Sequence, residues 1–122
     1  MDTNNKQYDL EERTFAFAKR CKDFIKKIPR SITNIEYGKQ LARSSGSQAA
    51  NYIEANESLS KKDFAMRIKI CRKESKESRL WLKLCDTGDD QGLKTEQDKL
   101  IQEALELTRI FGSIVEKYKK LI

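Results

Sequence analysis

The chain has 122 residues, of which 36% are charged and 38% hydrophobic, and 25 Lys and Arg residues outnumber 19 Asp and Glu residues to give a net charge of +6. This length suits one domain over residues 1–122 with a single hydrophobic core. The longest apolar run is Phe15–Ala18, far shorter than the roughly 20 residues of a membrane-spanning helix, so no contact with a membrane is expected.

Several features argue against an enzyme or a metalloprotein. The sequence contains no histidine, which is the commonest general base and the commonest transition-metal ligand. It also lacks a CxxC pair, a glycine-rich phosphate loop and any spacing typical of metal ligands. We therefore expect no catalytic residue, no metal and no cofactor.

The cysteines and the N-terminal residues indicate a cytoplasmic protein. Cys21, Cys71 and Cys85 are odd in number and far apart, which is typical of reduced thiols in the cytosol. Residues Met1–Gln7 are polar and have neither the apolar segment of a secretory signal nor the composition of a transit peptide.

Four segments repeat apolar residues every three or four positions, as amphipathic helices do, and none alternates with period two as a strand would. The first helix is predicted at residues 10–29 and ends at Pro29. The second, at 34–57, contains the small-residue segment Ser44–Asn51. A loop dividing the helix would explain this segment, but we favour one helix that another helix approaches closely, within the domain or from a second subunit. The third and fourth helices are predicted at 61–87 and 96–121.

Each predicted helix is preceded by a capping residue with an acid three positions later. The first side chain accepts a free backbone N–H, and the acid is stabilised in the positive first turn. The four pairs are Asp9/Glu12, Thr33/Glu36, Ser60/Asp63 and Thr95/Asp98. Short links between long helices favour antiparallel neighbours, so the sequence predicts an all-α, antiparallel up-down four-helix bundle.

One carboxylate lies where apolar residues are expected. On a helical wheel Glu74 falls near the middle of the apolar arc of the third helix, with Glu77 towards one side. A buried carboxylate must be paired, hydrogen-bonded or protonated, and breaking a buried pair costs about 3–5 kcal/mol. We therefore predict a structural polar network with donors on the second helix, the candidates being Arg43, Ser44, Gln48 and Asn51. A carboxylate metal site is less favoured because bundle sites of that kind use Glu-x-x-His, and exposure to solvent or at a subunit interface is the remaining alternative.

The excess positive charge is concentrated in the first and third helices. Residues 9–30 carry seven cations against four acids, and residues 60–86 carry nine against four. Five cations of the third helix recur at 3-4-3-4 spacing within about 60° of the wheel and span about 21 Å along the axis. These residues, called the cation stripe below, are Lys69, Arg72, Lys76, Arg79 and Lys83.

Two explanations of the cation stripe remain open. It is a solvated face balanced by acids on another helix or subunit, or a ridge that contacts the phosphates of RNA or DNA without reading bases. Lys19, Arg20, Lys26 or Lys27 could extend such a ridge. Trp81 lies in the apolar arc, which favours an anchor in the core or an interface over a platform for exposed bases.

Several segments match, in order, a pattern seen in a known family. They are Asp9–Ala18, Ile28-Pro29, Gln40–Ser47, Ala50–Ala55, Lys62–Phe64 and Lys73–Leu82. Over residues 8–120 the chain resembles the four-helix-bundle family encoded within intervening sequences of bacterial 23S ribosomal RNA genes. Ser78 stands where that family often has Thr. The resemblance implies a homopentameric ring and a nucleic-acid setting, since a related group serves as basic accessory factors to the reverse transcriptases of diversity-generating retroelements. It implies no catalytic reaction.

Two functions are consistent with these features. The first is a non-catalytic, nucleic-acid-binding or ribonucleoprotein accessory factor. The alternative is an oligomeric scaffold that binds a protein such as a reverse transcriptase or another polymerase without touching nucleic acid. Both include a homo-oligomer, because the apolar arc of the third helix covers about 200°, more than one core-facing stripe requires.

Overall fold

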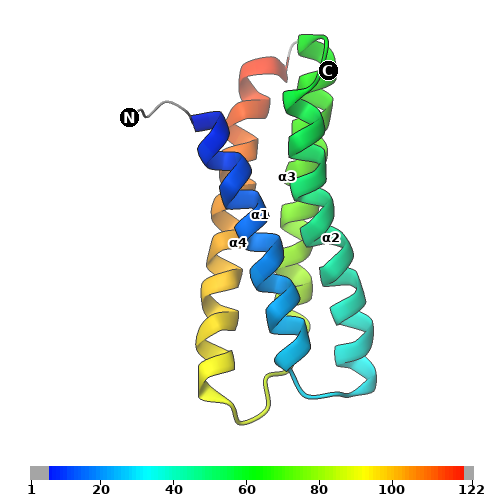
Figure 1. Cartoon of the computed structure of the whole chain (residues 1–122), viewed down its shortest axis with the longest axis vertical. Helices are drawn as coiled ribbons and strands as arrows, with labels where there is room; N and C mark the ends of the chain where they lie inside the picture. Colours follow the sequence, from blue (N-terminus) through cyan, green and yellow to red (C-terminus); the bar gives the residue numbers. More distant parts are fainter. Residues whose placement is uncertain (1–5, 120–122) are drawn as a thin grey trace.

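The computed structural model describes residues 6–119, which form four α-helices and no β-strand (Figure 1). The helices are α1 (Lys6–Lys27), α2 (Ile32–Asn56), α3 (Lys61–Leu84) and α4 (Gln91–Tyr118). In Figure 1 the chain runs down α1, up α2, down α3 and up α4, so the α1–α2 and α3–α4 links lie at the same end. The predicted all-α class with four helices is confirmed.

The predicted cap of α3 is confirmed and that of α2 is wrong. The Ser60 hydroxyl accepts a hydrogen bond from the Asp63 N–H at 3.1 Å, as predicted. For α2 the cap is Ser31 rather than Thr33, and its hydroxyl accepts from the Asn34 N–H at 3.1 Å. Starting the helix at Ser31 puts Asn34 inside the first turn, where its amide reaches both neighbouring links.

The cap of α4 was also mispredicted. Asp90, not Thr95, caps this helix, and its carboxylate accepts from the Leu93 N–H at 3.0 Å. The earlier start adds more than a turn and buries Leu93 against the core. Asp9 lies within the first turn of α1 instead of before it, and α1 and α3 end at residues 27 and 84 rather than 29 and 87. The predicted end of α4 at 121 lies outside the described residues, as does the polar segment 1–5.

The helices pack around one core, and the segment Ser44–Asn51 is a continuous part of α2. Where α2 meets α3, the buried contact includes two serines in place of large apolar residues. The hydroxyls of Ser44 and Ser78 share a hydrogen bond of 2.7 Å. Small side chains let these two helices lie close together. The apolar part of the core comes from all four helices and includes Phe17, Phe24, Leu41, Ile68, Leu82, Leu100, Leu107 and Phe111.

The two links at the lower end in Figure 1 are held together by one buried amide. Asn34 Nδ2 donates to the carbonyls of Pro29 at 2.8 Å and Asp86 at 2.9 Å, and Asn34 Oδ1 accepts from the Asp86 N–H at 2.9 Å. Gly88 in the second link has φ +66°, a left-handed conformation that glycine adopts without steric cost. These contacts fix where α3 ends and α4 begins.

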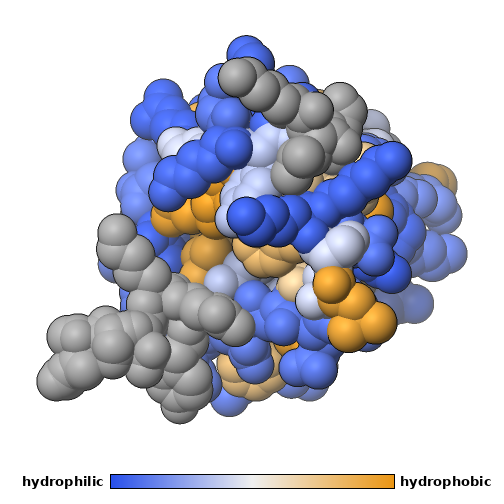
Figure 2. All heavy atoms as spheres, turned by 90° about the horizontal axis from the view of Figure 1, so that it is seen from above, coloured by the Kyte–Doolittle hydropathy of each residue, from blue (hydrophilic) through white to orange (hydrophobic). Residues whose placement is uncertain are grey.

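The surface is mostly polar, with apolar side chains in small separate areas. Figure 2 shows this on the end that carries the α2–α3 link, where hydrophobic residues appear among hydrophilic ones. On the sides of the helices, large apolar residues that are more than a third exposed are Phe15, Ile35, Ile53, Met66, Leu80 and Leu84. None of the described helices is both long and apolar enough to cross a membrane.

Candidate nucleic-acid interface

The cation stripe lines an open groove of about 680 Å³ between α3 and α4, called the basic groove below. The other residues that line it are Lys73, Glu77 and Leu80 from α3 and Leu105 and Thr108 from α4. The groove follows α3 because the 3-4-3-4 spacing keeps all five cations on one side of that helix. Arg72 reaches across to α4, where a β-carbon at Gly112 would lie 3.5 Å from Arg72 Nε.

The cations of the stripe have no acidic partner among the described residues. Among residues 6–119, none of the five forms an ion pair or a hydrogen bond with a carboxylate. Of the described residues that line the groove, Glu77 is the one acid, and its Oε1 accepts from Arg43 Nη2 at 2.9 Å on the other side of α3. No described acid of a neighbouring helix therefore pairs with the stripe, and balance by acids of another subunit stays a prediction.

One donor in the groove is both buried and unused. Arg79 Nε is shielded from solvent and has no hydrogen-bond acceptor in the part of the chain that the structure describes. Buried polar atoms almost always have a partner, and an unsatisfied one costs about 1–3 kcal/mol. An acceptor from outside the chain, such as a phosphate or carboxylate oxygen, would remove that cost.

Two leucines line the groove together with the cations. Leu80 of α3 is 48% exposed, and Leu105 of α4 is half-buried. The Thr108 hydroxyl donates to the Ala104 carbonyl at 2.7 Å, so this donor is already used within α4. The groove thus combines cationic and aliphatic side chains.

The opposite side of α4 is different because its acids pair with arginines of α1. Arg13 Nε and Nη2 donate to the two carboxylate oxygens of Glu103 at 2.7 and 2.9 Å, and Nη2 also donates to Glu106 at 2.8 Å. The hydrogen bond that Arg13 donates to Glu103 raises the pKa of Arg13, and hydrogen bonds donated by Gln102 and then by Arg13 lower the pKa of Glu106. The sequence analysis missed these pairs because the acids repeat in α4 with no local partner.

The α1 cations do not extend the stripe within one chain. In the described residues α1 packs against α2 and α4 but makes no contact with α3, so α1 and α3 are diagonal partners. Arg20 is also engaged, since it donates to both oxygens of Glu96 at 3.0 Å each. Lys19, Arg20, Lys26 or Lys27 could therefore extend the stripe only across subunits, and that extension stays a prediction.

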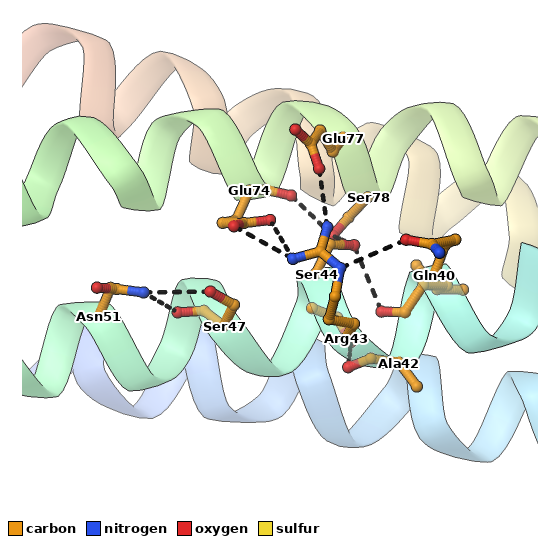
Figure 3. Close-up of polar contacts among 11 residues, drawn as sticks. Gln40, Ala42, Arg43, Ser44, Ser47, Asn51, Glu74, Glu77 and Ser78 are labelled. Atoms are coloured by element: carbon orange, nitrogen blue, oxygen red, sulfur yellow. Dashed lines mark hydrogen bonds and ion pairs between the residues drawn. The ribbon is translucent and has the colours of Figure 1, made fainter.

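On the far side of α3 the structure brings Arg43, Glu74 and Glu77 together (Figure 3). Arg43 Nη1 donates to Glu74 Oε2 at 3.3 Å and lies 3.2 Å from Oε1, while Nη2 donates to Glu77 Oε1 at 2.9 Å. The Glu74 side chain is 7% exposed and that of Arg43 is 48% exposed. The hydrogen bond to Glu74 is the main reason why the pKa of Arg43 is raised.

The other predicted donors do not reach these carboxylates. Asn51 donates to Ser47 one turn back and accepts from Arg67 at 2.9 Å, so its assignment to the Glu74 network is wrong. Gln48 donates to the carbonyls of Thr14 and Ser45 at 2.9 Å each. Ser44 bonds Ser78, as described above. Each of these side chains bonds a nearer partner, although the buried Oε1 of Gln48 has no donor among the described residues.

The remaining candidate groups lie in structural positions. The three cysteines are free and buried, and burial raises the pKa of Cys21 and Cys71 to about 12 and that of Cys85 to about 11, which keeps the thiols protonated. Trp81 stacks on Tyr37 with ring centroids 5.9 Å apart, between α2 and α3. Over residues 6–119 no group of three or more His, Cys, Asp or Glu residues could hold a metal ion.

The fold and the groove define an all-α protein of four helices with an unbalanced basic face. Residues 6–113 match the model of the 23S rRNA-intervening sequence protein family, and the chain belongs to that family. The fold is similar to a crystal structure of a protein of unknown function from the S23 ribosomal protein family of Bacteroides thetaiotaomicron, with a TM-score of 0.68 and 23% identity over 86% of this chain and 96% of that chain. This likeness shows the fold alone. No curated protein matches the sequence.

Proposed function

We propose that this protein is a non-catalytic, oligomeric accessory protein that binds RNA or DNA through the basic groove. The observation that carries the proposal is the set of five neighbouring cations without an ion-pair partner in residues 6–119, one of which also has an unused buried donor. Such neighbours repel one another by about 0.2–0.5 kcal/mol per pair in isolated helices. Phosphate oxygens would relieve that repulsion, and contacts to phosphates make the binding weakly sequence-specific.

Two further observations support this proposal. The family takes its name from intervening sequences of 23S rRNA, which supports a nucleic-acid setting. The thiols are protonated at neutral pH and the sequence has no histidine, which supports a binding role over catalysis. Three unpaired cysteines support a cytoplasmic location.

We also propose that the four helices form an antiparallel up-down bundle and that copies of it assemble into a closed homo-oligomeric ring, with five subunits as the family resemblance implies. The wide apolar arc of α3, on which Met66, Leu80 and Leu84 stay exposed, supports a second contact surface besides the core. Gly46 on α2 supports it too, because a β-carbon there would meet open space, so no contact within the described residues requires glycine. Light scattering should give a single closed oligomer, and the mass of one chain at micromolar concentration would contradict this.

The nucleic-acid proposal is tested by reversing charge in the groove. The triple variant Arg72→Glu, Lys76→Glu and Arg79→Glu should abolish RNA and DNA binding in fluorescence anisotropy, because three phosphate contacts become repulsive. Lys19→Glu, Lys22→Glu and Lys26→Glu, all on the exposed side of α1, form the matched control with the same change in net charge. Thermal melts and light scattering should be unchanged for both variants.

Two results would contradict the proposal. If the groove variant binds as well as the parent at the same salt, the basic groove is not the contact surface. If neither the parent protein nor the α1 control variant binds RNA or DNA while the oligomer persists, the function is better described as a scaffold for a protein partner such as a reverse transcriptase.

A further inference from the structure

Building on the proposed function, we infer that the basic groove takes one sugar–phosphate strand of a double-stranded nucleic acid, rather than a single strand whose bases the protein holds. The first reason is the composition of the groove. It is lined by the five cations of the stripe and by Leu80 and Leu105. A backbone strand presents matching groups, with phosphates for the cations and the apolar faces of the sugars for the leucines.

The second reason is that the groove has no aromatic platform for an unpaired base. Proteins that bind single strands stack bases on aromatic side chains, and none of the described residues lining this groove is aromatic. The tryptophan of the chain is stacked on Tyr37 between α2 and α3. In a duplex the bases stack on one another, so the protein has to supply no platform.

Apart from its cations, the groove offers few groups that read base edges. Among the described residues no Asn or Gln lines it, and its one hydroxyl, on Thr108, donates to the Ala104 carbonyl. The arginines are the remaining candidates, and Arg72 runs along Gly112 of α4. Contacts confined to the backbone are those by which proteins recognise duplexes through shape rather than sequence.

The third reason is length. The stripe from Lys69 to Lys83 spans about 21 Å of a straight helix, and one strand of B-form DNA carries a phosphate about every 3.4 Å along the axis. A stretch of one strand of that length carries about six phosphates and winds more than half a turn around the duplex axis, so the straight helix faces only some of them. The regular spacing of a duplex suits a rigid α-helix better than the variable spacing of a flexible single strand. Arg79 Nε, buried and unused, gains an acceptor from the same strand.

The test compares duplexes with their own strands. Fluorescence anisotropy at one salt concentration would use a 20-bp RNA duplex, a 20-bp DNA duplex and the separate, unstructured strands of each. We expect at least tenfold tighter binding of a duplex, with a log–log salt slope near −4.5 if all five cations contact phosphates. The α1 control variant should keep this preference and the groove variant should lose it, which separates the groove from general attraction between a basic protein and a dense polyanion.

Leu80→Tyr provides a gain-of-function test at a position that is 48% exposed. An added aromatic platform should raise the affinity for single strands severalfold and so reduce the preference for duplexes. Parent protein that binds single strands as tightly as duplexes, or a Leu80→Tyr variant with no gain for single strands, would overturn the inference and leave the proposed function standing. Absence of binding to all four probes would instead overturn the proposed function.

Discussion

The two sides of α4 differ in whether the cations of the neighbouring helix have acidic partners. Towards α1, α4 presents Glu96, Glu103 and Glu106, and these acids bind Arg20 and Arg13 through hydrogen bonds of 2.7–3.0 Å. Towards α3, α4 contributes Leu105 and Thr108 to a groove whose cations have no acidic partner among the described residues. The same helix therefore balances one basic neighbour and leaves the other unbalanced.

The α2–α3 contact extends this comparison. The two acids within α3, Glu74 and Glu77, both bind Arg43 of α2 and so do not relieve the cation stripe on their own helix. The arginines that join helices are paired with acids, and the cations of the stripe have no such partner among the described residues. This difference supports the proposal that the groove cations serve contacts outside the chain.

The largest expected effect comes from removing a paired arginine next to a buried carboxylate. Arg43→Ala leaves Glu74, 7% exposed, without its cation, and should lower the free energy of unfolding by about 2–4 kcal/mol. Glu74→Ala should cost less, about 1 kcal/mol, because Arg43 is half-exposed and keeps Glu77. This is smaller than the sequence alone predicts, since the exposed member of the pair is the arginine. Urea denaturation measures the free energy of unfolding of both variants. Equal decreases for Arg43→Ala and Glu74→Ala would show that Glu74 is solvated.

A direct comparison of two arginines addresses the two sides of α4. Arg13→Ala removes hydrogen bonds to Glu103 and Glu106 at partly buried sites and should cost about 1–2 kcal/mol. Arg72→Ala, in the groove, should change stability by less than about 0.5 kcal/mol because it has no partner to lose. Thermal melts measure both effects. Equal melting temperatures for the two variants would contradict the distinction between the paired α1–α4 side and the basic groove.

Acid should weaken the α1–α4 side. The pKa of Glu106 is lowered in the folded protein by Gln102 and Arg13, so its contribution to stability is present above its unfolded value and is lost as the pH falls through the folded value. The difference in stability between the parent and Arg13→Ala should therefore shrink as the pH is lowered from 6 to 3. Arg72→Ala serves as the control, and a difference for Arg13→Ala that stays constant with pH would contradict the assignment.

The sequence predicts the helices well because their periodicity is local, and it predicts pairings poorly because these are not. The cation stripe is visible at 3-4-3-4 spacing, and the burial of Glu74 follows from the wheel of a single helix. Which donor reaches Glu74 depends on the axial position of α2 relative to α3, which the sequence of neither helix determines. The predicted donors therefore include Arg43, which does reach Glu74, and Asn51, which does not. The caps at Ser31 and Asp90 were missed because Thr33 and Thr95 carry similar local signals. Only the tertiary contacts of Asn34 and Leu93 decide between them.

The central claim is that the groove cations serve an external partner rather than the fold, and Lys76→Gln tests it most directly. Lys76 has like-charged neighbours at Arg72 and Arg79, so removing its charge should leave stability unchanged or raise it by up to about 1 kcal/mol. The same substitution should weaken duplex binding and reduce the log–log salt slope by about one. Measuring the salt dependence of binding together with urea denaturation gives both quantities for one protein. A variant that loses stability and keeps the parent's salt slope would contradict the claim.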